Sequence, residues 1–353
     1  MNGTERIQAL LQGKEIDRTP IGGWYHMPLA DRNIRDFSEE LIMSTDSNHW
    51  DFMKIMTNGH YYTEAYGGKI HFSTKLDQWY GTILEYPVKN ARDAENLPVL
   101  EVDNPVFHRE LEVLKRMKDY YQDRIPLVAT IFNPLTALQE CAGSLDAGPM
   151  KKLMEEHPDA LHKALKAMTK TNMNYLDALF AEGIDGIFLA NQYSMEHIIS
   201  EEQYDEFCVP YEREIIQYCK GRTWFNMAHA HGDKKLRIQR YYGYGMDEIQ
   251  ALNWENCPAG LKEDEITTIK SVRSETDKIL ITGIDQNHDF MTPENDRELV
   301  KKRLVKRFQD AVLENGSNRF IFAPGCAMTP GGSYLNRLIY EVAEEYGKSA
   351  SAK

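Results

Sequence analysis

Short apolar runs alternate with longer helical segments along the second half of this 353-residue chain, and this alternation restricts the fold more than any other feature. Apolar runs of strand length lie at residues 125–131, 186–189, 223–228, 248–252, 279–282 and 320–323. The segments between them carry apolar residues at helical spacing, most clearly at 159–181 and at 297–315, where Gly316 ends the pattern. Strands that alternate with helices form parallel sheets with right-handed crossover connections.

Six such strands, together with two earlier ones near residues 20–23 and 52–56, predict an α/β fold of the closed (β/α)8 TIM-barrel type. A doubly wound open sheet is the alternative, but no glycine-rich phosphate loop follows the first strand. Residues 61–98 are rich in Tyr, Gly, Lys and Thr, and they predict an N-terminal insertion over the barrel mouth. No low-complexity linker divides the chain, so residues 1–353 are expected to form a single domain.

The charge balance and the cysteines restrict the partners and the compartment. A net charge of -13, from 54 acidic and 41 basic residues, argues against a nucleic acid or an anionic membrane as partner. No apolar run approaches the roughly 18 residues of a membrane span, and residues 1–17 lack the apolar stretch of a signal peptide. The five cysteines are widely spaced without a C-x-x-C pair, which is typical of a reduced, cytoplasmic protein.

Polar and metal-binding side chains gather where the predicted strands end. In a barrel of this type the active site is built from the loops at the carboxyl ends of the strands. The residues expected there are Asn191 and Ser194, His229 and His231, Glu255, Asp285, and Cys326. This concentration at strand ends predicts a functional site.

Two histidines and one cysteine of this set predict a metal site. His229 and His231 are two residues apart, so on a strand their imidazoles point to the same side. Cys326 arrives from a later strand directly after Gly325. Two imidazoles and a thiolate suit Zn²⁺, which in catalytic sites has three protein ligands and an open position, and Glu255 could supply a fourth ligand. An H-x-H pair is also typical of structural or substrate-binding histidines, and this alternative stays open.

Several short motifs, in this order, resemble one known family over nearly the whole chain. They are Asp17-Arg18-Thr19-Pro20, Asn133-Pro134-Leu135-Thr136, the run 181–186 followed by Ile199, Ser200, Tyr204, Phe207, Pro210 and Tyr211, then Gly283-Ile284-Asp285, and 323–327 with its Gly-Cys pair. The chain is thereby identified as similar to the uroporphyrinogen decarboxylase superfamily, and this resemblance implies a (β/α)8 barrel.

The decarboxylase reaction is not what the aligned positions imply. The arginine pair that holds the carboxylate arms of the tetrapyrrole falls on Tyr25 and Leu29, the key aspartate on Asn58, and the active-site tyrosine near Thr130. Only the serine is matched, at Ser194. Without the cationic clamp the site lacks charge complementarity to an octa-acid. A decarboxylase of a smaller polycarboxylate is the alternative function that the resemblance leaves open.

The other branch of the superfamily, the cobalamin-associated methyltransferases, implies a different chemistry. Its members bind zinc through an H-x-C motif and a later Gly-Cys motif, where this chain has His229, His231 and Cys326. The resemblance implies a zinc-dependent methyltransferase, with the metal polarising the atom that carries the methyl group. It also implies a corrinoid (cobalamin) carried by a separate protein, because no cobalamin-binding segment is visible here. One thiolate in place of two would make the zinc more electrophilic, which favours an ether or hydroxyl oxygen over a thiolate nucleophile.

Aromatic residues near the predicted mouth suggest the type of substrate. Trp24, Tyr25, Tyr61, Tyr62, Trp79 and Tyr80 would suit an aromatic methyl ether, although they could equally pack the insertion against the barrel. The residues expected to contact substrate are Trp24, Tyr25, His26, Asn58, Asn191, Ser194 and Asp285, and no catalytic group is expected beyond the metal site. A non-catalytic carrier that has kept the barrel is a third possibility.

Overall fold

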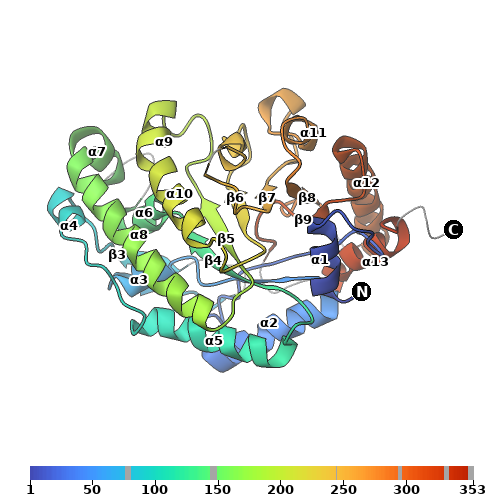
Figure 1. Ribbon diagram of the computed structural model, residues 1–353, viewed down its shortest axis with the longest axis horizontal. Coiled ribbons are helices and arrows are strands. Elements are labelled where there is room, and N and C mark those ends of the chain that lie inside the picture. The colour runs from blue at the N-terminus through green and yellow to red at the C-terminus, as the bar shows by residue number, and fades with distance from the viewer. Residues whose placement is uncertain (76–80, 144–148, 244, 293–295, 330–333, 349–353) are drawn as a thin grey trace.

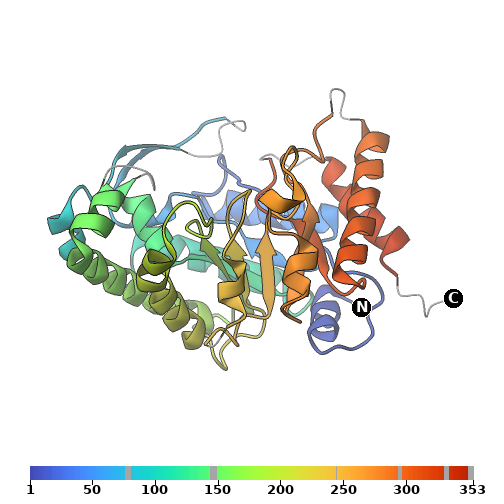
Figure 2. The same ribbon diagram turned by 90° about the horizontal axis from the view of Figure 1, so that it is seen from above.

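Seven parallel strands form the central sheet of the protein (Figures 1 and 2). The computed structural model describes residues 1–353 except 76–80, 144–148, 244, 293–295, 330–333 and 349–353. The sheet order is β1-β4-β5-β6-β7-β8-β9, so each strand lies beside the next one along the chain. Their bounds are β1 Met53–Ile55, β4 Leu127–Phe132, β5 Gly186–Asn191, β6 Met227–Ala230, β7 Ala251–Trp254, β8 Ile279–Ile284 and β9 Ile321–Pro324.

Helices cover the outside of this sheet (Figure 1). The α-helices are α1 Gly3–Leu11, α2 Ile34–Asn48, α3 Tyr61–Ala65, α4 Ala91–Glu95, α5 Pro105–Tyr121, α6 Pro134–Ala142, α7 Pro149–Glu156, α8 Pro158–Ala181, α9 Glu201–Phe207, α10 Val209–Tyr218, α11 Ile269–Arg273, α12 Arg297–Asn315 and α13 Leu338–Tyr346. Short 3-10 turns occur at Ile238–Tyr241, Glu263–Glu265 and Tyr334–Arg337. The alternation of strand and helix predicted from the sequence is confirmed, and the fold is TIM-barrel-like.

The segment around Ile21 lies between the first and last strands of the sheet. Ile21 forms a parallel bridge with Phe322 of β9, and Tyr25 forms another with Met328. On the other side, the backbone N–H of Asp51 donates to the carbonyl of Ile21 at 3.0 Å. The strand predicted at residues 20–23 is therefore present as isolated bridges, in the position that an eighth strand of a closed barrel would occupy.

The two best-defined helix predictions are confirmed by the structure. Helix α8 begins at Pro158, where a proline is tolerated because it needs no N–H partner, and buries Leu161, Leu165 and Met168. Helix α12 ends at Asn315, and Gly316 adopts the left-handed conformation (φ 73°) that glycine provides without strain. The predicted strands are also present, although β6 begins four residues later than expected and includes His229.

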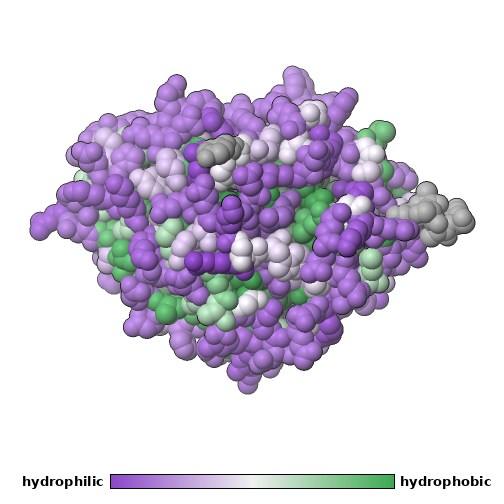
Figure 3. All heavy atoms as spheres, in the orientation of Figure 1, coloured by the Kyte–Doolittle hydropathy of each residue, from purple (hydrophilic) through white to green (hydrophobic). Residues whose placement is uncertain are grey.

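The inner and outer faces of the strands belong to two separate apolar clusters. Alternate residues point inward and form the smaller cluster, which includes Trp24, Phe52, Met56, Val128, Phe188, Met227, Ala251, Ile281 and Ile321. The opposite residues pack against the helices in the larger cluster. Apolar side chains are thus concentrated in the interior, and the face drawn in Figure 3 presents mainly hydrophilic residues. The residues of the inner cluster pack beneath the candidate site.

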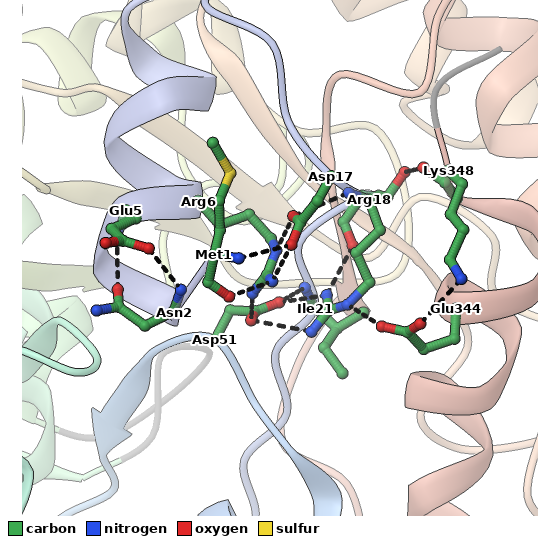
Figure 4. A network of polar contacts seen from close by, with 12 residues as sticks. Met1, Asn2, Glu5, Arg6, Asp17, Arg18, Ile21, Asp51, Glu344 and Lys348 are labelled. Carbon is green, nitrogen blue, oxygen red and sulfur yellow. Dashed lines mark hydrogen bonds and ion pairs between the residues drawn. The ribbon is translucent and has the colours of Figure 1, made fainter. Parts of the chain in front are cut away.

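A network of charged residues ties the two ends of the chain to the start of the sheet (Figure 4). Asp51, just before β1, accepts hydrogen bonds from Arg6 and from both terminal nitrogens of Arg18, at 2.7 and 3.1 Å for Arg18. Arg18 also pairs with Glu344 of α13 at 2.9 Å, and Arg6 pairs with Asp17. The Asp17-Arg18-Thr19-Pro20 motif therefore has a structural role at this end of the fold.

The region predicted to cover the barrel mouth contains helix α3 and the antiparallel hairpin of β2 Lys69–His71 and β3 Thr82–Glu85. Tyr61 and Tyr62 of α3 are fully buried and pack against Phe132, so they belong to the core rather than to a pocket wall. Trp79 and Tyr80 lie outside the described residues. A position of this region over the mouth stays a prediction.

No helix in the described part of the chain is long and apolar enough to cross a membrane.

Candidate metal centre

His229, His231 and Cys326 converge at the carboxyl edge of the sheet. His229 is the third residue of β6, His231 follows that strand by one residue, and Cys326 follows β9 by two. One ligand atom from each lies within 4.8 Å of the others. The Sγ atom of Cys326 is 3.5 Å from Nδ1 of His231. The i, i+2 spacing on a strand therefore places both imidazoles toward one point, and the distances are those of side chains that can share a metal ion.

Asn253 determines which nitrogen of His229 faces the site. Parallel pairing of β6 and β7 sets Asn253 beside His229, and its Oδ1 lies 2.7 Å from His229 Nδ1. The Asn253 amide nitrogen donates to the carbonyls of Ile281 and Pro324, at 2.8 and 3.0 Å. Oδ1 must therefore accept the Nδ1–H of His229, which leaves the Nε2 lone pair available. Metal-ligating histidines are oriented in this way by a partner on the other ring nitrogen.

Electrostatics in the group favour a thiolate beside a charged imidazole. Burial raises the pKa of the Cys326 thiol, but the neighbouring His231 and His229 outweigh burial and hold that pKa well below its usual value. Burial lowers the pKa of His231, yet the charge of Cys326 raises it to about 9. Burial lowers the pKa of His229, which keeps that imidazole neutral. A thiolate and a neutral imidazole are the ligand forms that zinc requires.

Glu255 lies beside this group but is not a member of it. Its carboxylate accepts a hydrogen bond from the Gln286 side chain at 2.8 Å, while Oε1 of Gln286 accepts the backbone N–H of Cys326 at 3.2 Å. Burial and the charge of Cys326 raise the pKa of Glu255 to about 7. Gln286 thus links the carboxylate to the cysteine loop, and the role of Glu255 as a fourth ligand stays a prediction.

Gly325 allows the cysteine loop to pass close to β7. A Cβ atom at this position would lie 2.6 Å from Cα of Glu255 and 2.7 Å from the carbonyl oxygen of Trp254. Both are backbone atoms, so they cannot move aside as the end of a flexible side chain can. The glycine of the Gly-Cys motif is therefore required by this close approach.

A pocket of about 330 Å³ opens beside the three residues. Its walls combine aromatic and polar side chains, and the residues that line it are Trp24, His26, Lys54, Met56, Thr57, Gly59, His60, Thr130, Phe132, Glu140, Phe188, Ala190, Gln192, His229, His231, Cys326 and Ala327. Phe188 stacks on the His229 imidazole with ring centroids 5.0 Å apart and meets Trp24 edge-on at 5.5 Å. The volume suits a small organic ligand.

The predicted substrate residues divide into two sets. Trp24 and His26 line the pocket, and burial lowers the pKa of His26 to about 3, so this imidazole is neutral there. The other predicted residues lie outside the pocket lining, and they are Tyr25, Asn58, Asn191, Ser194 and Asp285.

Each residue of the second set is held by contacts elsewhere. Tyr25 packs edge-on against the ring of Trp50, and Asn58 accepts the backbone N–H of His60. Asn191 donates to a buried carboxylate and to two buried tyrosine hydroxyls. Ser194 donates back to the carbonyl of Asn191, and Asp285 bonds to His288. Residues that follow a strand can turn toward the helix layer as easily as toward the mouth, so proximity to a strand end was insufficient to place these side chains in the pocket.

Lys54 is one of the pocket residues that were not predicted from the sequence. It is the middle residue of β1, only 4% exposed, and its Nζ lies 4.4 Å from the ring centroid of Phe188 and 5.7 Å from that of Trp24. Burial lowers its pKa to about 7. A signal was present in the sequence, because Phe52, Lys54 and Met56 share the inward face of the predicted strand 52–56.

His60, Glu140 and Gln192 form a polar wall of the pocket that was also missed. His60 Nδ1 lies 3.0 Å from a carboxylate oxygen of Glu140, and its Nε2 lies 3.1 Å from the carbonyl of Gly81. Gln192 lies within 3.5 Å of the other carboxylate oxygen of Glu140. Gln192 directly follows β5 and so lies at a strand end, whereas His60 precedes α3 and Glu140 lies within α6, where the strand-end pattern does not reach.

A TIM-barrel-like sheet carries a His-His-Cys group at its carboxyl edge, in which His229 is buried and His231 and Cys326 are partly buried. These features define the protein as a barrel with a candidate metal centre. A family model for uroporphyrinogen decarboxylase matches residues 2–336. The chain therefore belongs to the uroporphyrinogen decarboxylase family, as the order of its motifs indicated.

Individual relatives carry two different enzyme names. The chain is 27% identical over 146 residues to uroporphyrinogen decarboxylase of Geotalea daltonii, covering 40% of this chain and 42% of that protein. The match thus spans about two fifths of the length of that decarboxylase. It is 23% identical over 274 residues to the methylcobamide:CoM methyltransferase MtbA of Methanosarcina acetivorans, covering 75% and 71% of the two chains.

The solved structures agree with the fold. A methyltransferase from Methanosarcina mazei superposes with a TM-score of 0.76 at 17% identity, covering 98% of this chain and 99% of the other. A B12-independent methionine synthase from Shewanella sp. W3-18-1 superposes with a TM-score of 0.55 at 13% identity. The long match to MtbA supports the corrinoid methyltransferase branch of the superfamily. The full-length superposition supports the fold.

Proposed function

We propose that this chain is a cytoplasmic enzyme that transfers a methyl group between a small methylated substrate and a corrinoid carried by a separate protein. The convergence of His229, His231 and Cys326 beside a pocket of about 330 Å³ is the observation that carries the proposal. The similarity to a protein named methylcobamide:CoM methyltransferase supports the same reaction class. The five cysteines carry no disulfide, which agrees with a reducing compartment.

The three side chains fit Zn²⁺ by their chemistry. They offer two nitrogen donors and one sulfur donor, and Asn253 already presents Nε2 of His229 with its lone pair. When bound, zinc would supply an electrophile for the atom that carries the methyl group. A site with one thiolate neutralises the metal charge less than a site with two. We therefore propose that the atom that carries the methyl group is an ether oxygen, and that the substrate is an aromatic methyl ether.

The remaining pocket residues position the substrate and exclude water. Trp24 and Phe188 present aromatic surface, and such surface contributes roughly 0.5–1.5 kcal/mol per ring contact beyond burial. Gln286 holds the backbone of Cys326 and so fixes the thiol relative to the imidazoles. These residues account for selection of a planar substrate over methanol or a methylamine, which offer little surface to bury.

Metal analysis of purified variants tests the proposal. We expect about one zinc per chain in the wild type, and lower zinc content in His231→Ala and Cys326→Ser. Neither variant should unfold, because a core of this size does not depend on a metal. Cys257→Ser is the matched control, since Cys257 lies outside the three-residue group. Full zinc occupancy in the double variant would place the metal elsewhere, and no transfer from any methyl donor to a reduced corrinoid protein would contradict the reaction.

A decarboxylase of a polycarboxylate is the second candidate, because the family model and several relatives carry that name. Such an enzyme would be active without metal. Removing zinc with a chelator before the assay therefore distinguishes the two functions.

A further inference from the structure

The cation of Lys54 lies in the pocket wall without a carboxylate partner among the residues that the structure describes. The amino group contacts the thioether sulfur of Met56 and the faces of Phe188 and Trp24. Lys54 takes part in none of the ion pairs among the described residues, and its side chain is only 4% exposed. A buried ammonium without a counter-ion is costly, and such a group is retained where a ligand supplies the missing charge.

The carboxylates in and beside the pocket form hydrogen bonds with residues other than Lys54. Glu140 lines the pocket, but its oxygens face His60 at 3.0 Å and Gln192 at 3.5 Å. Glu255 accepts its hydrogen bond from Gln286. Neither carboxylate has a described contact with Lys54, so no carboxylate among the described residues provides the counter-charge.

The metal ligands do not provide it either once a metal is bound. Two neutral imidazoles, one thiolate and Zn²⁺ sum to a charge of +1. The Cys326 thiolate attracts Lys54 in the metal-free protein, but it would then be more than neutralised. A bound anion would stabilise the protonated form of Lys54 in the zinc-loaded pocket, beside the aromatic surface of Trp24 and Phe188, and an anion is therefore the electrostatic complement of this pocket.

We infer that the substrate is an aromatic compound that carries a compact anionic group, a carboxylate, and that Lys54 is the counter-ion of this group. The inference rests on the proposed function, because it places the methyl-bearing atom at the metal and the carboxylate at Lys54. The ring would lie against Phe188 and Trp24, whose faces already accommodate the ammonium. Lys54 is then a specificity-determining residue, which separates anionic from neutral methyl ethers.

Binding of two ligands that differ only in charge tests the inference. We would titrate meta-methoxybenzoate and its neutral amide, meta-methoxybenzamide, into the zinc-loaded protein and follow tryptophan fluorescence and heat. The wild type should bind the carboxylate at least about tenfold more tightly than the amide, because a hydrogen bond to a charged group is the stronger kind. Lys54→Met should remove this preference while its affinity for the amide stays unchanged.

Two controls separate Lys54 from the metal and from general charge effects. Lys301→Met removes an exposed lysine of α12 that pairs with Glu345, and it should keep the preference. Zinc-free wild type should also prefer the carboxylate, which shows that the anion does not sit on the metal. Lys54→Met should raise the melting temperature, since methionine replaces an unpaired buried charge by an apolar chain of similar length.

The outcomes distinguish this inference from the proposed function. A preference that persists in Lys54→Met, or one that disappears only when zinc is removed, would overturn it, as would failure of both ligands to bind. Absence of zinc or of methyl transfer would instead contradict the proposed function. The charge preference is measured by binding with and without metal, so it can be observed in either case.

Discussion

At the scale of single residues, hydrogen bonds hold two members of the candidate site: Asn253 fixes the tautomer of His229, and Gln286 holds the backbone of Cys326. Asn253 is fully buried, bridges the carbonyls of two neighbouring strands and accepts from His229. The amide therefore acts through the histidine and is a positioning residue. Gln286 does the same for the backbone of Cys326.

Asn253→Leu should lower zinc affinity about 10- to 100-fold, the usual cost of losing the partner of a metal-ligating histidine. The isosteric leucine leaves His229 free to adopt the wrong tautomer. Competition with a coloured chelator would measure the affinity, and thermal unfolding of the metal-free protein would show how much of the effect is structural. Unchanged zinc affinity would contradict the role given to Asn253.

The buried carboxyl of Glu110 in α5 links stability to pH. Burial raises its pKa to about 7, although Arg109 opposes this shift. The folded protein therefore keeps a proton that the unfolded chain loses above its ordinary pKa of 4.5. The stability provided by this proton is complete below pH 4.5 and is lost as the pH rises through 7.

Glu110→Gln should remove this contribution, and the free energy of unfolding should then fall less steeply between pH 5 and 7, by up to about 1.4 kcal/mol per pH unit. Denaturant titrations at several pH values would measure the slope. Glu112→Gln on the exposed side of the same helix is the control. A slope that is the same in wild type and Glu110→Gln would show that Glu110 is ionised in the folded protein.

At the scale of elements, the site requires the cysteine loop to pass the end of β7 at Gly325, with no side chain between the two backbones. Gly325→Ala should displace the cysteine loop, because the added Cβ would meet the backbone of Trp254 and Glu255. We expect weaker zinc binding and a lower melting temperature. Gly243→Ala adds a methyl group with no atom within 4 Å, so it should change neither. Equal behaviour of the two variants would contradict the close approach.

The charged network below the sheet joins α1, β1 and α13, and Asp51 is its centre. Asp51→Asn should destabilise the fold by about 3–5 kcal/mol, because two buried guanidinium groups lose their counter-charge. Asp17→Asn should cost about 1 kcal/mol or less, since this carboxylate is 42% exposed. Chemical unfolding of both variants measures the difference, and similar losses would argue against a central role for Asp51.

At the scale of the whole molecule, the alternation of strands and helices could be predicted from the sequence, because the same spacing of apolar residues recurs at each strand and helix. The inward face of the sheet and the helices α8 and α12 follow from residue spacing alone. His229, His231 and Cys326 were identifiable for the same reason, because their strands deliver them in register. The position of Asn191, Ser194 and Asp285 outside the pocket lining could not be predicted, because the direction of a loop after a strand depends on tertiary contacts such as the buried tyrosines around Asn191.

The pocket as a whole should exclude uroporphyrinogen as a substrate. Its described lining contains no arginine, and Lys54 is the lysine that it offers to a ligand with many carboxylates. We expect no decarboxylated product at a useful rate when the purified protein is incubated with uroporphyrinogen and the products are separated by chromatography. Product formation that depends on Ser194 would show that the decarboxylase alternative is correct.

The pairing of Arg18 with Glu344 joins residues that are 326 positions apart. Closing a chain loop of this length costs conformational entropy before any contact repays it, and folds dominated by such distant pairings form slowly. The cysteine of the candidate metal centre is likewise 95 positions beyond His231. Both histidines are therefore synthesised before the cysteine, and the three side chains come together only when β9, the last strand, pairs with the sheet. Under the proposed function, binding of a metal by all three side chains must therefore follow synthesis of the last strand.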